Sequence, residues 1–391
     1  MAVYKLFPEK DATLYSLLPS MNTGLDSQLE SSATAFAPTD PNPQVSRFLI
    51  QFNNTEMGSV LDNLIDDNSG TNYKAFLRFY SSKATGLTSD TTINIHLAAK
   101  NWNNGTGLYL DQPITTNGTS WIWTDRSGSN KWVTGANDTG SATVKWTGSY
   151  NSSYSQVGGG QWVYSSPSSS DWALSSSVTF SYRSALDVNT DITELLYHWV
   201  GSGSEAGADL SNYGFLVKLT GSQEFQPSKD VQPELKFFSV DTATIYPPQL
   251  EFRWDDFTWS TGSLSVLSSS TPYVSLAENP GTFNQDAVNR FRVYSRPEYP
   301  TRTFTTASLY ATNYYLPEGS TWAIKDLDTN EFVVNFDNNY TKLSADSTSC
   351  YFDVYMNGLE PERYYKIMIS SSIDGSQQIF DDKYYFKVIN G

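Results

Sequence analysis

Apolar and polar residues alternate in short runs along most of this chain. In residues 46–52, for example, Phe48, Ile50 and Phe52 occupy every second position, and residues 92–99 repeat the pattern. A period of two is typical of a strand that buries one face. Breaks rich in Ser, Asn, Gly and Pro separate these runs, so the pattern predicts an all-β protein.

Helical spacing occurs in two short stretches. Residues 57–65 predict one or two helical turns. Residues 192–200 predict a slightly longer helix, which Asp191 would cap.

Several short motifs follow one another in a recognisable order over roughly residues 1–254. They are Asp11-Ala12-Thr13-Leu14-Tyr15, Asn22-Thr23-Gly24, Leu29-Glu30-Ser31, Arg47 to Phe52, Trp102-Asn103-Asn104-Gly105, Ala185 to Val200 and Asn212 to Leu219. This order resembles the DNRLRE-type β-sandwich, a jelly roll found in tailed-phage virion proteins and bacterial surface proteins. The resemblance implies a module that binds and builds rather than catalyses, with an insertion at about 100–172.

The second half of the chain predicts a separate sandwich. Residues 255–280 are polar with scattered apolar positions, which indicates a linker, and strand patterns resume over 281–391. There Leu359, Pro361 and Tyr365 have the spacing of a tyrosine corner, so this part resembles an immunoglobulin- or fibronectin-type sandwich. The expected fold is therefore an N-terminal jelly roll followed by an immunoglobulin-like β-sandwich.

Charge and cysteine content narrow the function classes. The 391 residues carry a net charge of −16, which disfavours nucleic acid as a partner because phosphate contacts need clustered Lys and Arg. The single cysteine, Cys350, allows no intramolecular disulfide, and no apolar run is long enough for a signal peptide or membrane span. We expect a protein made in host cytoplasm and carried in the virion, with an extracellular location as the alternative.

Catalytic constellations are not evident in the sequence. The two histidines, His96 and His198, lack zinc-ligand spacing, and neither a nucleophile elbow nor a P-loop is present. Three adjacent carboxylate pairs are read as solvated turns, with loop Ca²⁺ sites as the alternative; they are Asp66-Asp67, Asp255-Asp256 and Asp381-Asp382. The sequence predicts a protein that is not an enzyme and has no cofactor.

Seven of the eleven tryptophans lie between Trp102 and Trp172. Indole rings stack on sugars, so glycan contacts are one hypothesis, and a subunit interface or the sandwich core are the others. If Trp121-Ile122-Trp123 is a strand, both indoles share one face. The candidate contact residues are Trp102, Trp121, Trp123 and Trp132.

These observations favour a structural protein of a tailed-phage virion, as a peripheral tail, neck, fibre or decoration component. Its expected partners are further copies of the chain, other virion proteins and a surface glycan, with neither nucleic acid nor membrane. The alternative is a bacterial extracellular carbohydrate-binding or adhesion module.

Overall fold

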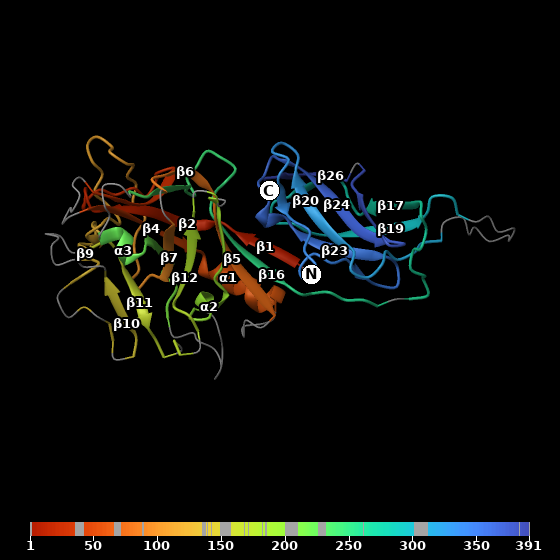
Figure 1. Ribbon diagram of the computed structural model, residues 1–391, viewed down its shortest axis with the longest axis horizontal. Coiled ribbons are helices and arrows are strands. Elements are labelled where there is room, and N and C mark those ends of the chain that lie inside the picture. The colour runs from red at the N-terminus through yellow and green to blue at the C-terminus, as the bar shows by residue number, and fades with distance from the viewer. Residues whose placement is uncertain are drawn as a thin grey trace. The chain divides into compact units, whose positions relative to one another are not determined.

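The computed structural model describes residues 2–35, 43–65, 72–87, 90–134, 138, 140–141, 143–148, 158–167, 169–170, 172–181, 183, 186–199, 210–225, 232–260, 262–300, 312–382 and 384–390. Of the described residues, 46% are in strands and 7% in helices, which confirms the predicted all-β sandwich class. It divides into an N-terminal unit, Leu6–Glu251, and a C-terminal unit, Phe252–Gly391 together with Met1–Lys5. Figure 1 colours the first unit from red to green and the second mainly from teal to blue.

An eight-stranded sheet dominates the N-terminal unit, in the order β12-β7-β14-β4-β3-β15-β6, with β2 also pairing with β4. Its strands are β2 (Pro8–Tyr15), β3 (Gln28–Thr34), β4 (Gln44–Phe52), β6 (Ser81–Thr85), β7 (Thr91–Leu97), β12 (Ser175–Phe180), β14 (Phe215–Leu219) and β15 (Glu234–Phe238). A second sheet has the order β1-β16-β5-β13. Its strands are β1 (Ala2–Leu6), β5 (Tyr73–Phe79), β13 (Val188–Asp191) and β16 (Gln249–Trp254).

Aromatic side chains join these two sheets. Phe79 of β5 packs against Phe48 of β4 and Phe237 of β15, with ring centroids 5.4 and 5.7 Å apart. This is the face that the alternation in residues 46–52 predicted to be buried. The opposite face of β4 is buried as well, because Leu49 belongs to a second apolar cluster. Strand β4 is therefore covered on both sides rather than half-buried.

The helices in the described part of this unit are short. They are α1 (Asn54–Ser59), the π-helical η1 (Val60–Ile65), α2 (Thr193–Leu196) and α3 (Gly221–Phe225). The helix α2 is shorter than predicted and its N-cap is Ile192, not Asp191. Asp191 lies one residue earlier and accepts hydrogen bonds from the amide and hydroxyl of Thr193.

Two predicted turns contact one another in the N-terminal unit. The Asn22 amide donates to the carbonyl oxygens of Asn104 and Thr119, at 2.7 and 2.8 Å. A Cβ atom on Gly24 would lie 2.2 Å from the Asn104 oxygen, so close backbone approach, and not a positive φ, requires glycine there.

The C-terminal unit contains two further sheets, in the orders β17-β19-β23-β22 and β18-β26-β24-β20-β21, with β25 pairing with β24. The first comprises β17 (Pro272–Ala277), β19 (Val288–Pro297), β22 (Ser344–Ala345) and β23 (Cys350–Tyr355). The second comprises β18 (Thr282–Asn284), β20 (Thr321–Asp326), β21 (Phe332–Val334), β24 (Tyr364–Ile373), β25 (Ser376–Phe380) and β26 (Tyr385–Ile389), and a 3-10 turn, η3, spans Met356–Gly358.

Aromatic packing also joins these sheets, since Trp322 of β20 stacks on Phe352 of β23 with centroids 4.9 Å apart. The Tyr365 hydroxyl donates to the Glu360 carbonyl, five residues earlier in the chain, at 2.9 Å.

Residues 255–280, predicted to be a linker, lie instead inside the C-terminal unit. Strand β17 pairs along β19, Leu267 is buried in the core, and Trp259 forms a bridge to Ala345. In residues 255–280 most polar side chains face outward, and an apolar side chain such as Leu267 or Val274 enters the core every few residues. Scattered apolar positions therefore reflect an irregular edge of the sandwich and not a solvated link.

Candidate functional site

The predicted contact tryptophans lie mostly inside the protein. Trp102, Trp121 and Trp132 are only 3%, 4% and 0% exposed. They pack with Leu14 and Leu49, on the face of the eight-stranded sheet that points away from β5. The tryptophan-rich insertion is thus a covering layer, and the core hypothesis applies to these three residues.

Hydrogen bonds fix two of these indoles. Trp102 Nε1 donates to the Tyr213 carbonyl and Trp132 Nε1 to the Ser120 carbonyl, both at 2.9 Å. Because their polar atoms are satisfied internally, neither ring can turn outward to a ligand without losing a buried hydrogen bond.

Trp121 and Trp123 do not share a strand face. Strand β8 (Trp123–Asp125) begins after Trp121, so the alternation assumed for residues 121–123 does not apply. Trp123 is half-buried, and the cations of Arg126 and Lys131 lie 5.6 and 5.0 Å from its ring. Of the four candidates, Trp123 is the one that is not fully buried.

A charged cluster lies beneath the covering layer. Arg47 of β4 donates from Nε and Nη2 to the two carboxylate oxygens of Glu224, at 2.8 and 2.9 Å, and both side chains are 0% exposed. Lys218 of β14 reaches the same carboxylate at 3.3 Å. The Arg47 guanidinium lies 5.0 Å from the Trp121 ring. Trp121 therefore shields a buried ion cluster.

His96 of β7 borders this cluster. Its ring stacks on Trp162, with centroids 5.3 Å apart. Burial, together with the positive charges of Lys218 and Arg47, lowers the pKa of His96 to about 3. A neutral imidazole stacked in this way is a packing group. His198 is fully buried, with Nε2 3.2 Å from the Ala173 carbonyl oxygen.

The carboxylate pairs provide no cation site in the described ranges. Asp66-Asp67 lies outside them, Asp255 and Asp256 are exposed, and Asp381 pairs with Lys366. Among the residues with described positions, no group of three or more His, Cys, Asp or Glu side chains could hold a metal ion.

Among the helices that the structure describes, none has both the length and the apolar character to cross a membrane.

A different set of side chains forms an ordered polar surface on the C-terminal unit. Alternate residues of β19 point away from the core and are Arg290, Arg292, Tyr294 and Arg296. The register places Tyr351 beside Arg292, Asp353 beside Arg290, and Tyr273 beside Arg296. We call these seven residues the arginine–tyrosine face.

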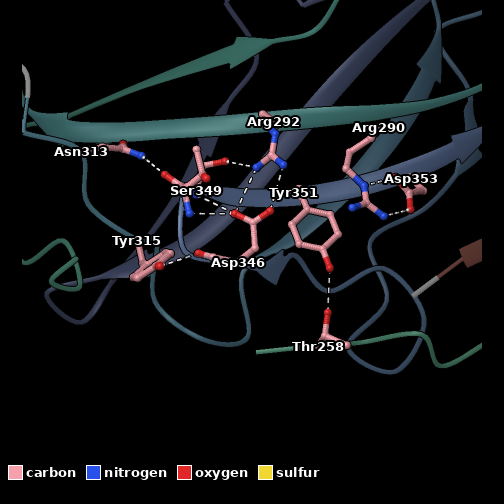
Figure 2. A network of polar contacts seen from close by, with 10 residues as sticks. Thr258, Arg290, Arg292, Asn313, Tyr315, Asp346, Ser349, Tyr351 and Asp353 are labelled. Carbon is pink, nitrogen blue, oxygen red and sulfur yellow. Dashed lines mark hydrogen bonds and ion pairs between the residues drawn. The ribbon is translucent and has the colours of Figure 1, made fainter. Parts of the chain in front are cut away.

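Two bidentate ion pairs hold this face in place, as Figure 2 shows. Arg290 binds Asp353 at 2.9 and 2.8 Å, and Arg292 binds Asp346 at 3.1 and 2.9 Å. Asp346 Oδ1 also accepts hydrogen bonds from the amides of Thr348 and Ser349. The hydrogen bond from Arg292 is the main cause that lowers the pKa of Asp346 to about 2.

Tyr351 lies between the two pairs (Figure 2). The guanidinium carbons of Arg290 and Arg292 are 4.2 and 5.9 Å from its ring centroid, and its hydroxyl lies 2.7 Å from that of Thr258. Planar guanidinium groups stack well on aromatic rings, so the ring fixes both arginines as the carboxylates do.

The sequence contained a signal for this face. Three of the chain's ten arginines occur at positions 290, 292 and 296, separated by even intervals within one strand pattern. Even spacing along a strand places side chains on one face, so this pattern predicts that the three arginines lie together on the outer face.

No protein-family model, curated protein or solved structure matches this chain. Function must therefore be argued from the arrangement of its own residues.

Proposed function

We propose that this protein is a non-enzymatic structural component that acts in assembly or attachment, as a peripheral part of a tailed-phage virion. The observation that carries the proposal is the arginine–tyrosine face of the C-terminal unit. The order of motifs in residues 1–254, which resembles modules of phage virion proteins, supports the virion setting.

Composition makes this face suitable for binding another protein. Arg and Tyr are enriched at the centres of protein interfaces, where they bury large area and form directional hydrogen bonds. Tyr273 and the Arg290 side chain are 48% and 49% exposed, so both can contact a partner. The ion pairs and the Tyr351 ring already order the arginines, which reduces the entropy lost on binding.

Charge complementarity favours a second copy of this chain as the partner. The chain has 41 acidic and 25 basic residues, yet three arginines are gathered on this one face. Arg290 and Arg292 are already paired with Asp353 and Asp346, so the net positive charge of the face comes from Arg296. That charge attracts the acidic surface of another copy, and salt weakens the attraction by screening it.

Light scattering over a dilution series tests the proposal. We expect oligomers that dissociate on dilution and at higher salt, and a strict monomer at every concentration would contradict self-assembly.

The genes that neighbour the gene for this protein test the virion setting. We expect portal, terminase and tail genes among them.

A further inference from the structure

A polar hollow of about 750 Å³ opens on the N-terminal unit. Its wall is formed by residues 100–103 on one side and on the other by the hairpin of β8 with β9 (Asn130–Lys131). The volume falls within the range of small-ligand pockets. This hollow belongs to a different unit from the arginine–tyrosine face, so it does not depend on the function proposed above.

Backbone hydrogen bonds hold the two walls together. The Asn103 amide donates to the Thr124 carbonyl at 3.0 Å, and the Asn103 carbonyl accepts from the Thr119 amide at 2.8 Å. Trp102, which contributes to the lining, is anchored in the core through Tyr213. The hollow therefore exists before any ligand arrives, and binding would require little ordering of the chain.

Neutral polar side chains dominate the lining. Asn101, Asn103 and Asn130 are all exposed there, and the hydroxyls of Ser129 and Thr134 lie beside them. Each amide offers both donors and acceptors, and each hydroxyl can act as either. A pocket of this composition favours a ligand rich in hydroxyl groups over an apolar one, since an apolar ligand would strip water from the amides without replacing it.

The charged groups of the lining offset one another. Lys100 donates to the Asp138 carboxylate at 2.6 Å and to the Trp132 carbonyl at 2.5 Å, which uses two of its three N–H donors. Those contacts hold the ammonium in place and compensate its charge. Lys131 and Asp125 add one charge of each sign. The hollow thus has no strong preference for an ion of either sign.

We infer that the polar hollow binds a neutral oligosaccharide. Its amides and hydroxyls are suited to vicinal sugar hydroxyls, and the third N–H of Lys100 can serve as one more donor. Trp123, half-buried on the same β8–β9 hairpin, is not part of the lining, and its ring lies 5.0 Å from the Nζ of the lining residue Lys131. A net charge of −16 disfavours anionic polysaccharides.

The test uses the full chain and an array of neutral oligosaccharides of glucose, galactose, mannose and N-acetylglucosamine, with sialylated glycans and polygalacturonate as anionic probes. We expect binding to at least one neutral glycan. The double variant Asn103→Ala with Asn130→Ala should weaken it about tenfold or more, because two exposed hydrogen-bonding amides are lost.

The matched control is Asn63→Ala with Asn189→Ala, two exposed asparagines of the same unit that lie outside the lining. It should bind like the wild type. Failure to bind any neutral glycan, binding to anionic probes only, or equal loss in both double variants would each overturn the inference. Self-association of the protein is a separate readout, so loss of glycan binding leaves the assembly proposal unaffected.

Discussion

The two units use the same kind of ion pair in opposite environments. In the N-terminal unit Arg47 and Glu224 are completely buried under the tryptophan layer, whereas in the C-terminal unit Arg290 and Asp353 form their bidentate pair on an outer sheet face. Buried charges are costly unless every one is paired, while surface pairs contribute little to stability and stay available to partners. The comparison separates a structural cluster from a surface that we propose binds a partner.

Removing the central carboxylate should give the largest effect. Glu224→Gln removes the buried carboxylate charge that both Arg47 and Lys218 contact, and we expect a loss of about 3–5 kcal/mol in the free energy of unfolding of the N-terminal unit. Asp353→Asn breaks the comparable surface pair and should cost about 0–1 kcal/mol in the C-terminal unit. Hydrogen exchange in increasing urea measures each unit separately, and similar losses for the two variants would contradict the distinction.

Truncation of the tryptophan layer should be nearly as severe. Trp132→Ala removes a fully buried indole that bonds to Ser120, and we expect a loss of about 3–5 kcal/mol. Trp123→Ala should cost clearly less, because that ring is half-buried. Urea unfolding followed by hydrogen exchange can rank the two. If Trp132→Ala left stability unchanged, the layer would not be core.

Acid should lower the free energy of unfolding of the two units in different pH ranges, because His96 of the N-terminal unit and Asp346 of the C-terminal unit have different pKa values. His96 has an ordinary pKa of 6.5 and a folded pKa of about 3, so the unfolded chain takes up a proton that the folded chain refuses, and stability falls as pH drops from about 6.5 towards 3. Asp346 has a folded pKa of about 2 against an ordinary 3.8, so its contribution is lost only as pH falls through that lower range.

The variant His96→Gln isolates the first window. Its unfolding free energy should depend less on pH between 6.5 and 4 than that of the wild type, and an unchanged slope would show that His96 does not titrate on unfolding.

The alternation of apolar and polar residues predicted the all-β class and many strands. It did not predict which part of the chain covers each face of a strand. Phe48, Ile50 and Phe52 correctly indicated one buried face of β4. The second face is buried by residues 102–132, which no local period around β4 can reveal. Arg47 and Glu224 are 177 positions apart, so their pairing depends on the strand order of the sheet.

The candidate site shows the same limit. Tryptophan content indicated an important layer, yet indoles serve equally well in cores and at surfaces, and only the packed structure separates Trp132 from Trp123. For the arginine–tyrosine face, the even spacing of the three arginines is visible in the sequence. The residues that lie beside them on β17 and β23 cannot be read from it, because they depend on how the strands pair.

Sedimentation velocity of two matched double variants tests most directly whether the arginine–tyrosine face assembles the protein. Arg290→Ala with Tyr273→Ala removes one cation and one exposed tyrosine from this face. Lys387→Ala with Tyr364→Ala removes the same chemistry from the six-stranded sheet of the same unit, where Lys387 Nζ lies 5.7 Å from the Tyr364 ring. We expect the first variant to raise the dissociation constant for self-association at least tenfold and the second to leave it unchanged. Equal association by both variants and the wild type would contradict the assignment of this face as an interface.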